Sequence, residues 1–191
     1  MKLTIIGNGN IGSGLAGALA GAGHNVTTVD QGDDIAAAVA GAEVVILATP
    51  YGAAADIAGL ADFAGKTVVD VSNPITADFS GLLVGHDTSA AESIAALLPG
   101  ATVVKAFNTV FAQHYASGLK VAGTPIQTYV AADDDAARDT VMALAKDIGL
   151  APVSAGPLKN ARYLEPLGFM NIQFGYVLGM GPTVAPQWLA A

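Results

Sequence analysis

The sequence predicts an α/β protein with a doubly wound, mostly parallel sheet of the Rossmann type and a short C-terminal helical segment. Short β-branched runs alternate with Ala-rich stretches that are long enough to form helices. Most of the strand-like runs are continuously apolar, which is typical of parallel strands covered on both faces. A glycine-rich turn also joins the first strand directly to the first helix. With 191 residues, the chain is expected to form one domain over 1–191.

Composition and charge exclude several classes of protein. Hydrophobic residues make up 52% of the chain and charged residues 13%, which excludes intrinsic disorder. The chain has no cysteine, so disulfides, a thiolate nucleophile and Cys-ligated metals are excluded. A net charge of −8 argues against nucleic acid and anionic membranes as partners. No apolar run reaches the roughly 18 residues of a membrane span, and the N-terminus lacks a signal-peptide layout, so a cytoplasmic location is expected.

The apolar runs and their flanking residues set the expected elements. Strands are expected at 3–6, 26–29, 44–48, 67–71, 102–106 and 126–130, and helices near 11–22, 33–41, 52–63, 89–98 and 136–148. Typical N-capping residues precede three of these helices: Asp33 or Asp34, Ser89, and Asp134 or Asp135. A further helix is expected from about 158 to 178, and 183–191 is expected to be irregular. We expect this C-terminal region, 157–191, to close the site.

The strongest motif is Gly7-Asn8-Gly9-Asn10-Ile11-Gly12, a G-x-G-x-x-G sequence that follows a strand and opens a helix. In this context Gly7 permits a tight turn, Gly9 lets the backbone approach a pyrophosphate, and Gly12 lets helix and strand pack closely. Unpaired N–H groups at the helix N-terminus would face the phosphates. The motif therefore predicts a dinucleotide site.

Asp30 ends the second expected strand, where an acidic side chain accepts hydrogen bonds from the adenosine ribose. A capping role is the alternative. The segment 31–34 that follows has two aspartates and neither Arg nor Lys. A 2′-phosphate would meet negative charge there without a counter-ion. The sequence therefore favours NAD(H), with NADP(H) as the second choice.

Three turns follow the carboxyl ends of expected strands, where open α/β sheets bind their ligands. They are Ala48-Thr49-Pro50-Tyr51, Ser72-Asn73-Pro74 and Ala106-Phe107-Asn108-Thr109. Turn chemistry alone could explain any one of them, but together they favour a nicotinamide pocket. We expect Asn108 and Thr109 to face the nicotinamide ring as catalytic residues, with Asn108 holding the carboxamide or the polar edge of the acceptor.

Other polar candidates are few. Among the histidines, His114 is the best placed to act near the site, His86 with Asp87 could approach it, and His24 is expected to be structural. The run Asp133-Asp134-Asp135 predicts a helix cap rather than a metal site, because consecutive residues converge poorly on one ion. No metal is expected. Lys159 and Asn160 are expected to be a solvent-facing helix start and a local cap.

The segments IIGNGNIGSGLA at the start, DVSNPI at 70–75, VVKAFNTV at 103–110 and SAGPLKNARYLEP within 149–166 resemble the coenzyme F420-dependent NADP oxidoreductase family. These small Rossmann proteins are related to the oxidoreductase domain of STEAP ferric reductases. The resemblance covers nearly the whole chain. It implies direct hydride transfer between a nicotinamide and a deazaflavin stacked in one cleft. It also implies that 106–110 and the C-terminal helix shape the second pocket.

The expected function is therefore hydride transfer between NAD(P)(H) and a flavin-like or deazaflavin (F420) acceptor. This chemistry suits a chain with few acid–base residues, because it depends on positioning and on the exclusion of water. The alternatives are a non-catalytic dinucleotide-binding sensor and a reductase for a small carbonyl or imine substrate. A homodimer is expected, because the residues at 164–177 are apolar around much of the last helix.

Overall fold

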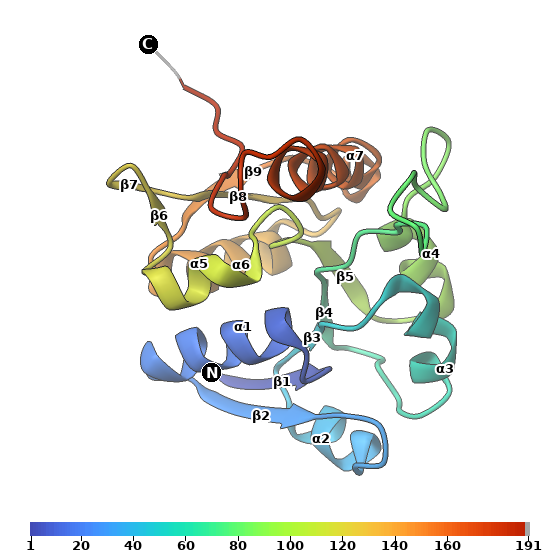
Figure 1. Cartoon of the computed structure of the whole chain (residues 1–191). Coiled ribbons are helices and arrows are strands. Elements are labelled where there is room, and N and C mark those ends of the chain that lie inside the picture. The colour runs from blue at the N-terminus through green and yellow to red at the C-terminus, as the bar shows by residue number, and fades with distance from the viewer. Residues whose placement is uncertain (190–191) are drawn as a thin grey trace.

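A parallel sheet of five strands forms the middle layer of the computed structural model, which describes residues 1–189 (Figure 1). The strand order is β2-β1-β3-β4-β5. The strands are β1 (Lys2–Ile6), β2 (Asn25–Val29), β3 (Val44–Leu47), β4 (Thr67–Asp70) and β5 (Thr102–Lys105). The expected doubly wound α/β fold is confirmed. The order changes direction between β1 and β3, so the carboxyl ends of these two strands flank the switch point.

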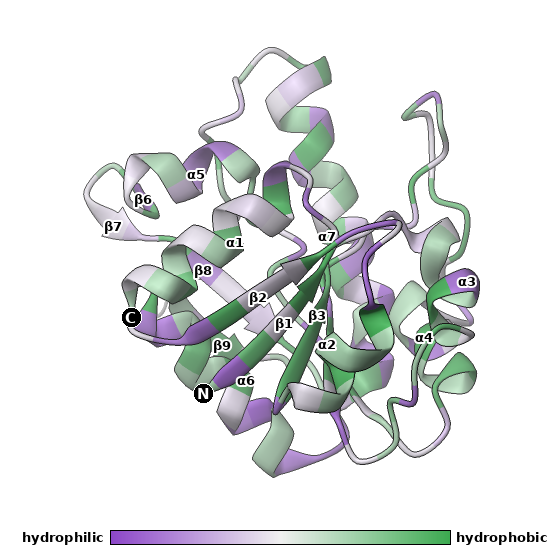
Figure 2. Ribbon diagram, turned by 90° about the horizontal axis from the view of Figure 1, so that it is seen from below, coloured by the Kyte–Doolittle hydropathy of each residue, from purple (hydrophilic) through white to green (hydrophobic). Residues whose placement is uncertain are grey.

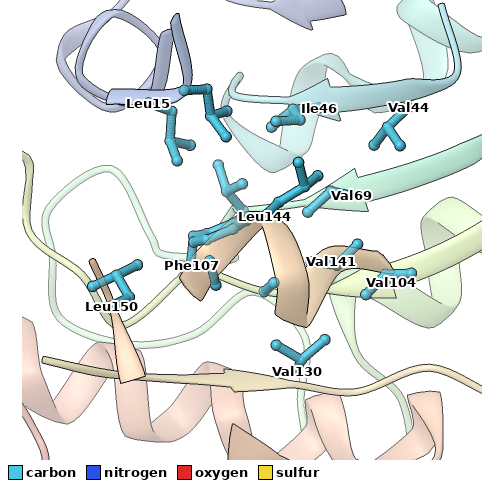
Figure 3. Packing of buried hydrophobic residues seen from close by; sticks show 14 of the residues in the cluster. Leu15, Val44, Ile46, Val69, Val104, Phe107, Val130, Val141, Leu144 and Leu150 are labelled. Atoms are coloured by element: carbon cyan, nitrogen blue, oxygen red, sulfur yellow. The ribbon is translucent and has the colours of Figure 1, made fainter. Parts of the chain in front are cut away.

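Helices cover both faces of the sheet. One face carries α1 (Asn10–Gly21) and α6 (Asp135–Asp147), and the other carries α2 (Ile35–Gly41), α3 (Ala54–Ala58) and α4 (Ala90–Leu97). Figure 3 shows the first face, where Leu15 of α1 and Leu144 of α6 pack with Ile46 of β3. Figure 2 shows β1 and β3 largely hydrophobic and β2 mixed, since β2 lies at the sheet edge.

The expected helix caps are present. The Asp34 carboxylate accepts from the Ala37 N–H at 3.0 Å, and the Asp134 carboxylate accepts from the Ala137 N–H at 2.7 Å. The Ser89 hydroxyl accepts from the backbone N–H of Glu92 at 3.1 Å. Each side chain satisfies one of the N–H groups that a helix start leaves unpaired.

The chain after β5 departs from the expected layout. The sixth expected strand exists as β8 (Gln127–Val130), but it pairs in parallel with β9 (Ala151–Ser154) in a separate two-stranded sheet. One antiparallel bridge, between Lys105 and Ala131, connects it to β5. Four elements were not expected from the sequence: β9 and the short elements α5 (Ala112–Ser117), β6 (Lys120–Val121) and β7 (Thr124–Pro125). Pro152 obscured β9, because proline is tolerated only where a strand needs no ladder N–H.

Two of the expected helices also differ from the prediction, one in length and the other in being divided into segments. The helix expected at 52–63 is a 3-10 turn, η1 (Tyr51–Ala53), followed by α3. The helix expected at 158–178 is three consecutive segments: η2 (Leu158–Asn160), α7 (Ala161–Ile172) and the π-helical η3 (Gln173–Val177). In Figure 1, α7 lies across β8 and β9, and Leu164 packs there with Tyr129 and Ala131.

After η3, residues 178–189 contain no helix or strand, and this range includes the described part, 183–189, of the expected irregular tail. The last two residues of that expected tail, 190–191, lie outside the described residues. Across residues 1–189, the longest apolar helices fall short of what a bilayer crossing requires.

Candidate active site

The glycine turn between β1 and α1 has the geometry that its sequence predicts. Gly7 has φ +108°, and a Cβ there would lie 2.6 Å from the Ala48 carbonyl oxygen. A Cβ on Gly12 would lie 2.0 Å from the Gly7 carbonyl oxygen. Both positions therefore require glycine. By contrast, nothing lies within 4 Å of an added Cβ at Gly9, so the start of α1 is open to a ligand.

A hollow of about 300 Å³ lies beyond the carboxyl ends of β1, β3 and β4. Its wall contains many of the residues that the sequence assigned to a cofactor: Gly9, Asn10, Ile11, Ala48, Thr49, Pro50 and Asn73. Ser72, the first residue of the second predicted turn, also lines the hollow. The structure adds Val71 and Ile75, which were not predicted as site residues. We call this hollow the dinucleotide cleft. Its place at the switch point between β1 and β3 is where open α/β sheets bind nucleotides.

Asp30 lies beside the glycine turn, at the end of β2. Its Oδ2 accepts from the Asn8 N–H at 3.2 Å and its Oδ1 from the Gln31 N–H at 2.8 Å. The side chain is exposed, so its remaining acceptor capacity faces solvent. The neighbouring Asp33 accepts from the Asp30 N–H at 2.8 Å. This end of the cleft offers carboxylate acceptors, which suits ribose hydroxyls, so the residues present fit the adenosine side of a dinucleotide.

A second hollow, of about 560 Å³, adjoins the first. Its lining is almost entirely apolar: Asn10, Ile11, Phe79, Phe111, Ala112, Ile172, Tyr176 and Val177. We call it the acceptor pocket. The rings of Phe111 and Tyr176 meet edge to face with centroids 5.2 Å apart. Gly175 allows this approach, because a Cβ there would lie 2.7 Å from the Phe111 ring. The C-terminal segment thus forms one wall of this hollow. The family resemblance also assigned 106–110 to a second pocket, but no residue of that segment lines this hollow.

Four other predicted residues lie beneath these walls. Ala106 and Phe107 are buried in the core, at 0% and 1% exposure, and Thr109 is 1% exposed. Asn108 is 8% exposed, and its Nδ2 donates to Asn73 Oδ1 at 2.9 Å and to the Leu164 carbonyl at 2.8 Å. None of the four is among the residues that line either hollow.

Asn73 connects this buried turn to the dinucleotide cleft. Its Nδ2 donates to the Asn108 carbonyl at 2.8 Å, so the two asparagines are doubly hydrogen bonded. Gly168 of α7 packs on the pair, since a Cβ there would lie 2.5 Å from Asn73 Oδ1. The geometry therefore gives Asn108 a positioning role through Asn73. Pro74 is buried next to Asn73. Direct contact of Asn108 or Thr109 with a nicotinamide stays a prediction.

A buried charge cluster lies below the same loop. Lys105 Nζ is 2.7 Å from Asp70 Oδ2 and 2.9 Å from Glu165 Oε1, and all three side chains are at most 1% exposed. The ammonium also donates to the carbonyl of Ser72, which lines the dinucleotide cleft. Glu165 accepts from the first N–H groups of α4, those of Ala90 and Ala91, at 2.9 and 3.2 Å. The cluster thereby connects β4, β5, α4 and α7 under the cleft.

None of these three residues was predicted from the sequence to belong to a site, although all three lie in the segments that carry the family resemblance. A signal was present: Asp70 and Lys105 sit in otherwise apolar strands, and charges buried in a sheet need partners. Burial raises the pKa of the Glu165 carboxyl, against the opposing effect of Lys105.

The remaining polar candidates lie elsewhere. His114 is 1% exposed, and its Nε2 is 3.1 Å from the Val184 carbonyl, so it connects α5 to the tail. His24 Nε2 is 3.2 Å from Asp147, which supports the structural role. His86 is exposed, and it does not line either hollow. Lys159 faces solvent as expected, but Asn160 donates to the Ala155 carbonyl and does not cap the helix.

The aspartate run acts locally. Asp134 caps α6, Asp133 accepts from the Leu158 N–H at 3.0 Å, and Asp135 pairs with Arg138. Within residues 1–189, no group of three or more His, Asp or Glu side chains is arranged to hold a metal ion.

Comparison with known proteins agrees with this geometry. Residues 2–74, which contain the glycine turn, Asp30 and Asn73, match the family model described as NADP oxidoreductase, coenzyme F420-dependent. This match places residues 2–74 of the chain in that family of oxidoreductases. A proposed F420-dependent NADP reductase from Arthrobacter sp. FB24 is 27% identical and superposes with a TM-score of 0.85 over 100% of both chains. The resemblance inferred from the sequence is confirmed.

Two further relatives also match most of the chain. The hypothetical protein SMa0349 from Sinorhizobium meliloti is 30% identical, with a TM-score of 0.72 over 83% of this chain and 86% of that one. Metalloreductase STEAP3 from Rattus norvegicus is 32% identical over 181 residues, which is 87% of this chain and 36% of STEAP3. The chain thus spans about a third of the length of this curated relative.

Proposed function

We propose that this chain is a single dinucleotide-binding domain that transfers hydride between a nicotinamide dinucleotide and a flat, flavin-like or deazaflavin acceptor. The observation that carries the proposal is that the dinucleotide cleft and the acceptor pocket share Asn10 and Ile11. Two rings seated in the two hollows would meet at these residues. The family match to NADP oxidoreductases supports the same assignment.

The chain's own residues supply binding and orientation. The backbone of 7–12 and the N-terminus of α1 hold the pyrophosphate, and Asp30 holds the ribose. Asn73, fixed by Asn108, offers its amide at the cleft wall. The apolar pocket keeps water from the reacting atoms. A reduced dinucleotide held by these residues would supply a hydride from its nicotinamide C4–H bond to an acceptor ring in the second hollow.

The pocket lining favours ring-to-ring transfer over reduction of a carbonyl or imine. Reduction of a carbonyl needs a proton donor next to the reacting atom. Among the residues of the acceptor pocket, the one titratable side chain is Tyr176, and its hydroxyl donates to Gln113 at 3.2 Å. Positioning and exclusion of water suffice for hydride transfer between stacked rings.

We further propose that NADH is preferred to NADPH. The support is the carboxylate-rich end of β2, where Asp30 and Asp33 lie together and 31–34 contains no cation. Fluorescence titration of the purified chain with NADH and NADPH tests this. NADH should bind more tightly than NADPH. Asp30→Ala should weaken NADH binding and reduce the difference in affinity between the two dinucleotides. NADPH binding at least as tightly as NADH would overturn the preference.

The catalytic proposal is tested separately, by NADH oxidation with riboflavin, FMN and F420 as acceptors. Turnover with at least one of these rings is expected. Tight binding of NADH without turnover on any of them, or on a carbonyl panel, would instead support the dinucleotide-binding sensor.

We also propose that the chain forms a homodimer through its C-terminal segment. Large apolar side chains are exposed along and after η3: Phe174, Tyr176, Val177, Leu178 and Met180. Contiguous apolar surface of this kind commonly marks an interface. Light scattering at micromolar concentration should give twice the mass of the chain, and the mass of a single chain would contradict the proposal.

A further inference from the structure

We infer that Ser72 is a binding residue of the dinucleotide cleft, and that its hydroxyl takes a polar group of the nicotinamide riboside, either the carboxamide or a ribose hydroxyl. The inference rests on the proposed function and deepens it by naming a side-chain contact. It is carried by a buried hydroxyl without a protein partner, in a residue whose main chain is fixed on both sides.

Buried charged groups hold the main chain of Ser72. Its N–H donates to Asp70 Oδ1 at 2.9 Å, and its carbonyl accepts from Lys105 Nζ. The Lys105 ammonium and the Asp70 carboxylate are themselves 2.7 Å apart, and both side chains are 0% exposed. Hydrogen bonds to charged groups are stronger than those between neutral ones. The buried cluster therefore fixes the position of Ser72 at the carboxyl end of β4.

The side chain of Ser72 has no such partner. Ser72 is 8% exposed and lines the dinucleotide cleft, yet its Oγ makes no hydrogen bond to any residue of the described range 1–189. A second buried serine, Ser89, shows the contrast: its Oγ donates to Glu92 Oε2 at 2.8 Å and accepts from the Glu92 N–H at 3.1 Å. A buried hydroxyl without a partner costs free energy.

A ligand in the cleft can supply the missing hydrogen bond. Both main-chain polar groups of Ser72 are engaged with the buried cluster, so the side chain is the part left to contact a ligand. Rotation about χ1 moves Oγ between staggered positions while the main chain stays fixed. The cluster thus holds a hydroxyl at the wall of the cleft without using it.

The strand order indicates which part of a dinucleotide reaches Ser72. The order is β2-β1-β3-β4, with Asp30 after β2, the glycine turn after β1 and Ser72 after β4. With the adenosine ribose at Asp30 and the pyrophosphate at the start of α1, the remaining half extends past β3 toward β4. That half is the nicotinamide riboside, whose polar groups are a carboxamide and two ribose hydroxyls. A serine hydroxyl both donates and accepts, so it matches either group.

Three ligands of increasing length test the contact in the wild-type chain and in Ser72→Ala. NADH has the whole nicotinamide riboside, ADP-ribose lacks the nicotinamide ring, and ADP lacks the riboside. Ser72→Ala should weaken NADH binding about fivefold, the effect of one neutral hydrogen bond, and leave ADP binding unchanged in calorimetric titrations. A similar loss for ADP-ribose assigns the hydroxyl to the ribose, and no loss for ADP-ribose assigns it to the carboxamide. Unchanged NADH affinity, or an equal loss for ADP, would overturn the inference.

Thermal unfolding of the ligand-free chain separates a binding role from a structural one. Ser72→Ala removes a hydroxyl that has no partner, so Tm should stay equal or rise. Ser89→Ala is the matched control, because Ser89 is buried, caps α4 and does not line the cleft. It should lower Tm by about 2–4 °C and leave NADH affinity unchanged. An equal fall of Tm in the two variants would assign Ser72 a structural role and contradict the inference.

The result does not depend on the preferred dinucleotide or on turnover. NADPH has the same nicotinamide riboside, so Ser72→Ala should weaken its binding by the same factor. The predicted loss of affinity, together with a wild-type chain that reduces no acceptor, would reject hydride transfer and keep the contact. Wild-type turnover together with unchanged NADH affinity in Ser72→Ala would reject the contact and keep the proposed function.

Discussion

The glycine turn and the buried charge cluster stabilise the same cleft by opposite means. The turn is built from consecutive residues, 7–12, and it acts through backbone geometry and the N-terminus of α1. The cluster joins Asp70, Lys105 and Glu165 from three separate elements, and it acts through contacts between side chains that are at most 1% exposed. The turn forms the floor of the cleft at β1, and the cluster holds the loop after β4 through the Ser72 carbonyl.

The difference between them sets how each can fail. A turn made by close backbone contacts fails when an atom is added, because neither Gly7 nor Gly12 has room for a Cβ. A buried cluster is destabilised when one charged group is removed, because the remaining charged groups are left buried without a partner. Substitutions that add volume therefore test the glycine turn, and substitutions that remove charge test the buried cluster.

Removing the cation of the cluster should have the largest effect. Lys105→Met leaves the carboxylates of Asp70 and Glu165 buried without their partner, so the free energy of unfolding should fall by about 3–5 kcal/mol. Urea unfolding measures it. Lys120→Met, at an exposed lysine of β6, should change the stability by no more than about 0.5 kcal/mol. Similar losses for the two variants would show that the cluster contributes little.

The cluster should also give stability a characteristic pH dependence. Burial raises the pKa of Glu165 above its ordinary value of 4.5, so the folded chain holds that proton more tightly than the unfolded chain. The free energy of unfolding should therefore fall as pH rises from about 4.5 through the raised pKa. Glu165→Gln should remove this part of the fall in urea titrations across pH. Parallel curves for the two proteins would contradict the raised pKa.

Adding one methyl group to the turn should have the next largest effect. Gly12→Ala places a Cβ 2.0 Å from the Gly7 carbonyl oxygen, so the backbone must shift, at a cost of about 1–3 kcal/mol. NADH affinity should fall with it. Gly17→Ala lies on the same helix with open space around it, and it should gain about 0.5–1 kcal/mol. Calorimetry and NADH titration of both variants check the prediction. Equal losses of stability and NADH affinity in the two variants would contradict the specific role of Gly12.

The asparagine pair should show a smaller effect that is specific to turnover. Asn108→Ala leaves Asn73 Oδ1 and the Leu164 carbonyl without their donor. The lost hydrogen bonding that positions Asn73 should raise the activation free energy of hydride transfer by about 0.5–1.5 kcal/mol. Because the pyrophosphate and ribose contacts remain, kcat for NADH oxidation should fall while NADH affinity holds. Asn25→Ala, at the exposed start of β2, is the control. An equal loss in kcat and affinity would assign Asn108 a purely structural role.

The half-exposed pair of Arg162 and Glu92 should matter least. Two hydrogen bonds of 2.8 and 2.7 Å join them, but solvent reaches both side chains. A double-mutant cycle of Arg162→Met with Glu92→Gln should give a coupling of about 0.2–1 kcal/mol. A coupling as large as the loss in Lys105→Met would remove the contrast between buried and exposed charge.

The sequence by itself determined the elements whose signal is local. The glycine turn, the caps at Asp34, Ser89 and Asp134, and five of the apolar strands follow from residues close in the chain. Backbone sterics and capping act over a few residues, so they can be read without knowing the fold. Asp30 could be placed for the same reason, since the βαβ unit fixes where β2 ends.

Only the tertiary structure decided the rest. Asp70 and Lys105 lie 35 residues apart, and Glu165 reaches them from α7. The pairing of β8 with β9, the burial of Asn108 behind Asn73, and the wall that η3 adds to the acceptor pocket likewise depend on how distant segments pack. A buried charge or amide shows in the sequence that it needs a partner, but its position along the chain does not say which partner the fold brings to it.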